Sequence, residues 1–123
     1  MNNILLDTNI LIYLLQGDTA VREMLEEKTW YISYVNEMEL LMKPNVDAQE
    51  LKAIEALLKE CIIIEMNNAV KKQAILNGRR FRMKLADSIV LAAAQINNIP
   101  LLTADAEFKK ASKDNNDVLL YIP

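Results

Sequence analysis

Short apolar runs alternate with longer helix-forming stretches along the whole of this 123-residue chain, and this alternation limits the folds it can adopt. Each run is apolar throughout, which is typical of a strand buried on both faces of a sheet. The predicted strands are Ile4–Leu6, Trp30–Ile32, Ile62–Ile64, Pro100–Thr103 and, as a possible fifth, Val118–Tyr121. Strands that alternate with helices form parallel sheets. We therefore predict an α/β fold: a three-layer α/β/α sandwich with a central, mainly parallel sheet of 4–5 strands, as a single domain over residues 1–123.

The stretches between these runs carry residues that start and stop helices. Asp7, Asp18 and Ser33 are suitable N-caps, while Gly17 and Pro44 end the helices that precede them. The predicted helices cover residues 10–15, 19–28, 34–42, 48–59, 67–78, 86–97 and 106–111. The scarcity of glycine and proline elsewhere agrees with a high helix content.

The side chains that most often hold transition metals are almost absent. The chain has no histidine and a single cysteine, Cys61, so a bound metal is expected to take oxygen ligands. One cysteine excludes an internal disulfide, which favours a reducing compartment. No apolar run is long enough to span a membrane and no secretory signal is recognisable, so we expect a cytoplasmic protein with no membrane partner.

Positive charge is concentrated in one segment of a chain whose net charge is −3. Residues 66–86 contain no acid, and their basic residues are Lys71, Lys72, Arg79, Arg80, Arg82 and Lys84. A segment of this kind is either a solvated helix face followed by a loop, or a patch that binds anions.

Acidic residues follow the predicted strands at the edge where parallel sheets bind ligands. Asp7 follows the first strand, and Asp105 comes two residues after Thr103, which closes the fourth. Glu39 lies in the helix after the second strand, and Asp87 opens the helix that leads to the fourth. In a parallel sheet these positions converge beyond the carboxyl ends of the strands. Clustered carboxylates repel one another unless a hard cation such as Mg²⁺ or Mn²⁺ lies between them.

Each acid also has a purely structural interpretation. Asp7 and Asp87 suit helix caps, and Asp105 suits a turn. Glu37 competes with Glu39 for the inward position on its helix. The predicted buried stripe of that helix consists of Val35, Met38, Leu41 and Met42. Glu39 flanks this stripe whereas Glu37 lies nearer the far side, so we favour Glu39.

Four sequence blocks resemble those of the PIN-domain family, in the family order and over nearly the whole chain. Leu5–Ile12 is similar to the opening block, an apolar strand followed by Asp-Thr-Asn, and Ile32–Val35 with Glu39–Leu41 is similar to the second. Leu85–Ala94 resembles the third, an Asp that opens an Ala-rich helix, and Leu101–Phe108 resembles the fourth, a Thr with an acid two positions on. The closest resemblance is to the short bacterial VapC-type toxins of toxin–antitoxin pairs.

This resemblance implies an endoribonuclease that uses one or two Mg²⁺ (or Mn²⁺) ions. The implied catalytic acids are Asp7, Glu39, Asp87 and Asp105, and the implied metal ligands are Asp7, Asp87 and Asp105. Asn9 and Thr103 become polar supports, and we expect the basic segment to bind RNA phosphates. Two positions depart from the family pattern: Ala104 stands where a basic residue is common, and no glycine follows Leu41.

The resemblance also implies a cognate antitoxin that covers the acidic cleft. A homodimer is expected from surplus apolar residues, although these also suit a core; they are Ile12, Tyr13, Leu40 and Leu41. Alternatives are an inactive PIN-like domain that binds RNA or acts as a scaffold, and a stand-alone RNA-processing nuclease. A dehalogenase-like phosphatase would need an Asp where Asn9 stands, and a receiver domain would need an acidic pair at the first strand.

Overall fold

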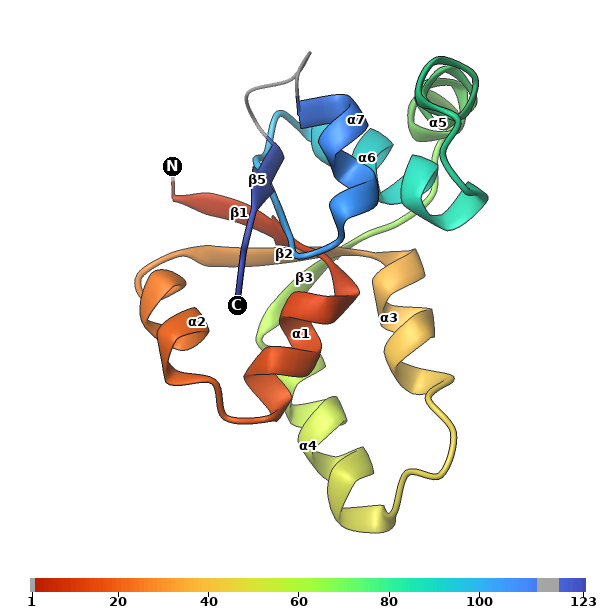
Figure 1. The fold of residues 1–123 in the computed structure, drawn as a ribbon. Coiled ribbons are helices and arrows are strands. Elements are labelled where there is room, and N and C mark those ends of the chain that lie inside the picture. Colours follow the sequence, from red (N-terminus) through yellow and green to blue (C-terminus); the bar gives the residue numbers. More distant parts are fainter. Residues whose placement is uncertain (1, 113–117) are drawn as a thin grey trace.

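The computed structural model describes residues 2–112 and 118–123, and in this part of the chain the strands form a single parallel sheet (Figure 1). The strands are β1 Asn3–Leu6, β2 Thr29–Ser33, β3 Cys61–Ile64, β4 Leu101–Thr103 and β5 Val118–Leu120. Their order is β3-β2-β1-β4-β5, and every neighbouring pair is parallel. The predicted α/β fold is confirmed, including the fifth strand.

Helices connect successive strands. They are α1 Thr8–Leu15, α2 Thr19–Met24, α3 Tyr34–Leu41, α4 Ala48–Lys59, α5 Asn68–Phe81, α6 Leu85–Asn97, the 3-10 helix η1 Ala106–Phe108 and α7 Lys109–Ser112. The expected caps are present: the Asp18 carboxylate accepts from the Val21 amide, and Ser33 forms a capping box with Asn36. The helix predicted over residues 19–28 is shorter than expected, because α2 ends at Met24.

Gly78 does not end α5, contrary to the sequence-based expectation. The helix continues to Phe81 and ends at Arg82, whose backbone is left-handed with φ 54°. A Cβ at position 78 would lie 3.4 Å from the Ser88 hydroxyl of α6. Gly78 therefore allows α5 and α6 to pack closely, and its role is in packing between helices rather than in stopping one.

Two apolar cores cover the two faces of the sheet. Ile4 and Leu6 of β1 face a core with residues of α1 to α4, whereas Leu5 faces the opposite core with α6 and α7. Figure 1 shows α1, α2 and α4 below the sheet and α5, α6 and α7 above it. This alternation explains why the strands are apolar at every position, since both of their faces are buried.

The order of the strands places a topological switch at the centre of the sheet. The chain moves outward from β1 to β2 and β3, then returns to β4 on the other side of β1. Ligands of open α/β sheets bind where the connections diverge in this way, at the carboxyl ends of the strands. The switch here is between β1 and β4, so Asp7 and Thr103 lie at it.

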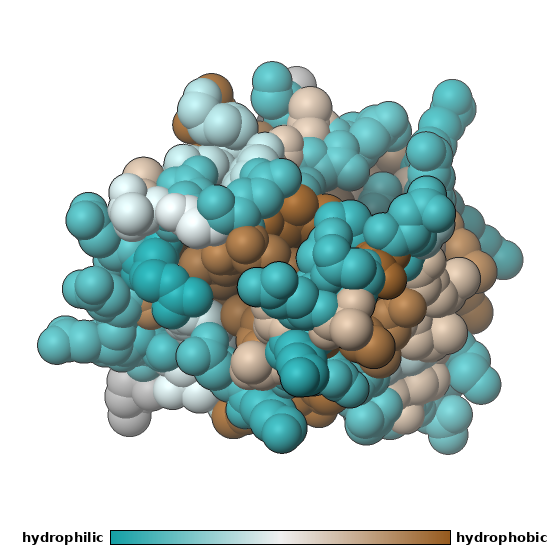
Figure 2. Space-filling model, turned by 90° about the horizontal axis from the view of Figure 1, so that it is seen from below, coloured by the Kyte–Doolittle hydropathy of each residue, from teal (hydrophilic) through white to brown (hydrophobic). Residues whose placement is uncertain are grey.

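The buried stripe predicted for the helix after the second strand is wrong. The buried residues of α3 are Asn36 and Leu40, while Met38, Leu41 and Met42 are about half exposed or more. Seen from below, apolar side chains gather at the centre of the face that the lower helices form (Figure 2). The predicted stripe is wrong because it assumed that only apolar residues turn inward, whereas the polar Asn36 turns inward to a buried hydrogen-bond network.

No helix in the described part of the chain could cross a membrane.

Candidate active site

Asp7 is a buried carboxylate at the switch between β1 and β4, and polar groups from three elements hold it. Its side chain is 7% exposed. The Thr103 hydroxyl donates to Asp7 Oδ2 at 2.6 Å, and the Thr8 amide and Asn36 Nδ2 donate to Oδ1 at 2.9 and 3.2 Å. Asp7 is also the N-cap of α1, so its structural interpretation and its place at the sheet edge are both correct. Burial raises the pKa of Asp7, and this outweighs the hydrogen bonds from Thr103 and Thr8, which lower it.

Glu39 joins this network from α3. The Thr8 hydroxyl donates to Glu39 Oε1 at 2.6 Å and accepts from Asn36 Nδ2 at 3.0 Å. The charge of Glu39 contributes to raising the pKa values of both Asp7 and Asp87. The structure therefore places Glu39 rather than Glu37 at the site, although the stripe used to choose it was wrong.

Asp87 and Asp105 complete the acidic group. Burial, followed by the charges of Asp105, Asp7 and Glu39, raises the pKa of Asp87 to about 6, against a smaller opposing effect of Lys84. Asp105 is the N-cap of η1 and accepts from the Glu107 amide at 2.9 Å. The four acids thus interact electrostatically across elements that are distant in sequence. We refer to Asp7, Glu39, Asp87 and Asp105, with Thr8, Asn36 and Thr103, as the acidic network.

The acids are close enough to repel one another but do not form a ready-made chelate. Within residues 2–112 and 118–123, no group of three or more acidic, cysteine or histidine side chains is arranged to hold a metal ion. The ion pair between Lys110 and Glu107, within the described residues, involves none of the four acids. The four acids of the described residues are thus neighbours in charge without a preformed set of metal ligands.

The predicted polar supports have different roles. Thr103 is fully buried and, besides donating to Asp7, its hydroxyl accepts from the Asp105 amide at 3.0 Å. It therefore couples β4 to two of the acids. Asn9 accepts from the Ala104 amide at 3.1 Å, which fixes the segment after β4 against α1. Asn9 supports the loop that carries Asp105 rather than an acid directly.

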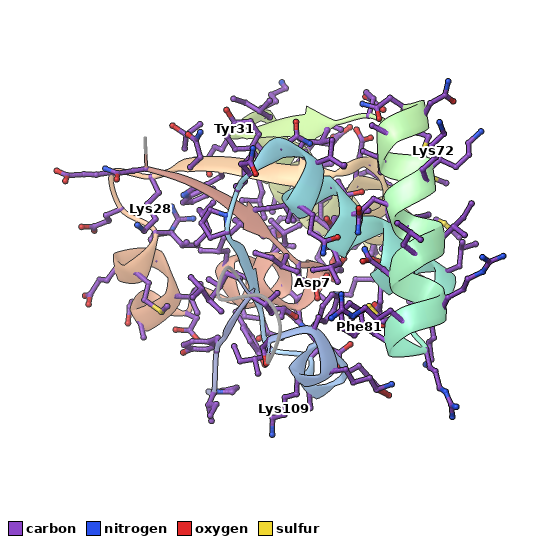
Figure 3. All side chains as sticks on the ribbon, turned by 90° about the horizontal axis from the view of Figure 1, so that it is seen from above. Asp7, Lys28, Tyr31, Lys72, Phe81 and Lys109 are labelled. Atoms are coloured by element: carbon purple, nitrogen blue, oxygen red, sulfur yellow. The ribbon has the colours of Figure 1, made fainter. Side chains whose placement is uncertain are left out.

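The basic residues do not form one patch. Lys84, the residue before α6, is near enough to Asp87 to lower the pKa of that acid. Arg80 and Arg82, with Phe81 and Lys110, line a cavity of about 390 Å³. In Figure 3, Phe81 lies on the Asp7 side of α5, whereas Lys72 lies at the far end of that helix. Lys71 and Lys72 are therefore separated from the acids, and Arg79 to Lys84 are the basic residues on the near side.

Two residues of the network were not predicted from the sequence. Asn36 donates to Asp7 and Thr8 and accepts from the Ser33 amide at 2.9 Å, so one buried amide orients three groups. Thr8 connects Asp7 to Glu39. The available signal for Asn36 was its position three residues after the Ser33 cap, where a side chain can reach back to the cap.

Cys61 is not a candidate ligand or nucleophile. Its thiol is half-buried on β3 and donates to the Leu57 carbonyl of α4 at 3.5 Å. Burial, with a smaller effect of Glu60, raises its pKa to about 11. The thiol therefore stays protonated near neutral pH, which leaves oxygen atoms as the available metal donors.

A parallel sheet whose switch point collects four carboxylates is the type of site that metal-dependent hydrolases of nucleic acids use. A family model described as the PIN domain matches residues 4–114. The match covers most of the chain, and the protein belongs to the PIN-domain family, which is a family of nucleases. No curated protein matches the chain.

Solved structures with the same fold include chains of toxin–antitoxin complexes. One, from a toxin–antitoxin complex of Klebsiella pneumoniae, is 30% identical, with 85% of this chain and 89% of that chain covered and a TM-score of 0.76. A chain of VapBC2 from Rickettsia felis, bound to a promoter DNA fragment, is 16% identical, with 97% of each chain covered and a TM-score of 0.76. A chain of DNA-bound VapBC from Salmonella typhimurium is 18% identical, with 89% and 92% covered and a TM-score of 0.79. The similarity to the Rickettsia felis and Salmonella typhimurium chains shows the fold alone.

Proposed function

We propose that the protein is a Mg²⁺-dependent endoribonuclease whose catalytic residues are Asp7, Glu39, Asp87 and Asp105. The observation that carries this proposal is the gathering of these acids at the β1/β4 switch, where burial and then the charges of the other three acids raise the pKa of Asp87 to about 6. A cluster of like charges at a ligand-binding edge destabilises the fold unless it serves a bound cation. Hydrolysis of a phosphodiester is the chemistry that such a site supports best.

The donor set fits a hard divalent cation, because every available donor is a carboxylate, hydroxyl or amide oxygen. Asp7, Asp87 and Asp105 would hold one or two ions of Mg²⁺ or Mn²⁺, with Glu39 binding directly or through water. When bound, such a cation supplies Lewis-acid chemistry at the phosphate and lowers the pKa of a water molecule. No histidine is then required as a general base.

The protein's own groups act by orienting the acids. Thr103 and Asn36 donate to opposite oxygens of Asp7, which fixes the plane of this carboxylate. Thr8 restrains Glu39 through its hydroxyl. Lys84, which lies near Asp87, and the arginines of residues 79–82, at the end of α5, would bind phosphates of a single strand.

The test is incubation of the purified protein with total cellular RNA in Mg²⁺, with cut ends mapped by sequencing. We expect discrete cleavage sites that disappear in EDTA and in the Asp7→Asn variant. Glu55→Gln, an exposed change on α4, serves as the matched control and should cleave like the parent. Cleavage by Asp7→Asn at the parent rate in excess Mg²⁺ would show that the acids do not carry the reaction.

We also propose a toxin role, with a small cognate antitoxin as partner. The support is the similarity to chains of toxin–antitoxin complexes. The antitoxin would cover the acidic network with a basic side chain, and the product of the adjacent gene should therefore co-purify with this protein and inhibit cleavage. Absence of such a protein would favour the stand-alone processing nuclease. Both functions are expected in the cytoplasm.

Self-association remains a prediction, and the structure narrows the residues that could mediate it. Leu40 is 1% exposed and belongs to the core, and Ile12 and Tyr13 pack against that core. Of the four apolar residues proposed for a dimer interface, Leu41 is the exposed one.

A further inference from the structure

A second polar cluster, separate from the acidic network, lies between α5 and α6. It consists of three side-chain amides, which we call the amide chain: Gln73, Asn77 and Gln95. Asn77 is 1% exposed. Its Nδ2 donates to the Ser88 carbonyl at 3.2 Å and to Gln95 Oε1 at 2.8 Å, and its Oδ1 accepts from Gln73 Nε2 at 3.2 Å. The three amides therefore form one continuous hydrogen-bonded chain across the two helices.

The backbone carbonyl of Ser88 fixes the direction of the amide chain. A carbonyl oxygen only accepts, so the NH₂ group of Asn77 must face Ser88 and its oxygen must face Gln73. Gln73 must then present its NH₂ group to Asn77, and Gln95 must present its oxygen. In the described part of the chain no hydrogen bond engages Gln73 Oε1 or Gln95 Nε2. One acceptor and one donor are thus held in fixed orientation for a ligand.

The amide chain lines a cavity of about 470 Å³, a size that suits a small-molecule or nucleotide pocket. Arg79, Arg80 and Phe81 line the same cavity. The guanidinium carbon of Arg80 lies 5.3 Å from the centroid of the Phe81 ring, so two planar side chains lie together in the lining of the cavity. Unpaired bases stack on aromatic and guanidinium planes and are read by a donor beside an acceptor on their edges. This combination fits a nucleobase better than it fits a phosphate alone.

The cavity lies within reach of the acidic network. Gln95 comes eight residues after Asp87 on α6, a separation of about 12 Å along the helix axis. A neighbouring cavity, which shares Arg80 and Phe81 with the first, extends to Arg82 and to Lys110 of α7. A few nucleotides of single-stranded RNA would span this distance.

We propose that the amide chain binds one unpaired nucleobase of a single-stranded RNA segment and contributes sequence preference to cleavage. This proposal rests on the proposed function, because it takes the same RNA as its ligand. Phosphate contacts at Arg79 and Lys84 would position the strand without reading its sequence, whereas the Gln73 acceptor and the Gln95 donor would read a base edge.

The direct test needs no cleavage. The full chain, in Mg²⁺-free buffer, is titrated with each of the four ribonucleoside 5′-monophosphates, and the side-chain amide signals of Gln73, Asn77 and Gln95 are followed by NMR. We expect at least one nucleotide to shift these signals saturably, while ribose 5-phosphate, the base-free probe, leaves them in place. Equal shifts with ribose 5-phosphate, or no shift with any nucleotide, would overturn the proposal.

The sharpest variant is Gln95→Glu, which keeps the acceptor for Asn77 and removes the Nε2 donor. We expect affinity for the preferred nucleotide to fall about five- to tenfold, the effect of one lost hydrogen bond of this kind. Gln49→Glu, an exposed change on α4, adds the same charge elsewhere and should change it less than about twofold. Gln95→Met distinguishes loss of the donor from the effect of an added charge. It removes the Nε2 donor without adding a charge, and it should also weaken nucleotide binding.

Equal effects of Gln95→Glu and Gln49→Glu, or parent affinity in Gln95→Met, would overturn the proposal. In active preparations the base preference at mapped cut sites should change in both Gln95 variants. A protein that binds nucleotides at the amide chain yet cleaves no RNA would refute the nuclease function and still support the pocket, so the two failures are distinguishable.

Discussion

The acidic network and the amide chain are each hydrogen-bonded around a buried polar side chain, Asp7 in one and Asn77 in the other, yet they differ in charge. In the acidic network, three neutral groups donate to the Asp7 carboxylate, while burial and the charges of Glu39 and Asp105 raise its pKa. In the amide chain, all groups are neutral and every donor and acceptor of the buried Asn77 amide has a partner, while Gln73 Oε1 and Gln95 Nε2 stay available to a ligand. In the described part of the chain no buried side-chain nitrogen or oxygen lacks a partner, so both clusters satisfy their hydrogen bonds.

The comparison teaches that satisfied hydrogen bonds and balanced charge are separate properties. The amide chain leaves no buried atom without a partner and should stabilise the fold even without a ligand. The acidic network is complete in hydrogen bonds but not in charge, and it should destabilise the fold until a cation binds. Substitutions in the two clusters should therefore have opposite effects on the stability of the protein without a bound cation.

The largest effect is expected from Asp87→Asn. Cleavage should fall at least about 100-fold, because loss even of groups that support metal ligands costs about 10–100-fold. In EDTA the same variant should unfold at a higher temperature than the parent, since it removes a charge that Asp105, Asp7 and Glu39 oppose. RNA cleavage assays and thermal unfolding measure the two effects, with Glu55→Gln as control. A lower unfolding temperature in EDTA would contradict the charge imbalance.

Asn77→Ala should produce the opposite pattern. It leaves the Ser88 carbonyl, Gln73 and Gln95 without their buried partner, and the free energy of unfolding should fall by about 2 kcal/mol. Asn97→Ala is the matched control: it also removes an amide bonded to a helix carbonyl, that of Ala93, but at an exposed position. It should cost about 0.5 kcal/mol. If urea unfolding showed equal losses of unfolding free energy in the two variants, the amide chain would stabilise the fold no more than a surface hydrogen bond does.

Thr103→Val tests how the acidic network holds Asp7. The substitution removes the donor to Asp7 Oδ2 and the acceptor for the Asp105 amide. Cleavage should fall about tenfold. The Thr103 hydrogen bond lowers the pKa of Asp7, so its loss should move the acid limb of the activity–pH profile to higher pH. Thr29→Val, at an exposed position on β2, should leave both unchanged.

The dependence of stability on pH should reveal the charge imbalance without any RNA. The folded-state pKa of Asp87 is raised from 3.8 to about 6, so its carboxyl binds its proton more tightly in the folded protein. The stability it contributes is complete below pH 3.8 and is lost as the pH rises through about 6. In EDTA, the unfolding temperature of the parent should fall about 4 °C further than that of Asp87→Asn between pH 4 and 7. Saturating Mg²⁺ should remove the difference; a parent that gains stability over this range relative to Asp87→Asn would reverse the sign we expect.

The smallest effect distinguishes the two ends of the basic segment. Lys84→Gln, beside Asp87, should weaken binding of single-stranded RNA about threefold and reduce the salt dependence of that binding. Lys72→Gln, at the far end of α5, should change affinity less than about twofold. Equal losses in fluorescence anisotropy titrations would mean that the whole segment follows the RNA backbone.

Local patterns were sufficient to predict the strands and most helices, because burial on two faces requires runs that are apolar at every position. The acids after β1 and β4 were predictable as well, since parallel strands bring their carboxyl ends to one edge. Glu39 was chosen correctly but from a wrong assignment of the buried face of α3. That assignment assumed that buried residues are apolar, whereas Asn36 is polar and is buried because it forms hydrogen bonds there.

Groups that depend on contacts between distant segments were not predictable. Asn77 reads as an ordinary polar residue of α5, and its partners Ser88 and Gln95 lie on the next helix. Gly78 reads as a helix stop, because its close approach to α6 has no local signal. The separation of Lys71 and Lys72 from the other basic residues likewise follows from the length and orientation of α5.

The missing side chain at Gly78 has a consequence for the geometry of the neighbouring amides. Ser88 faces Gly78 with its hydroxyl and accepts from Asn77 with its carbonyl, so one residue of α6 meets two consecutive residues of α5. A methyl group added at position 78 would lie 3.4 Å from that hydroxyl, so it would fill the space between the two helices. The close approach that lets Asn77 reach across to Gln95 thus leaves room for no more than a methyl group at position 78, and a larger side chain there would have to displace the wall of the pocket.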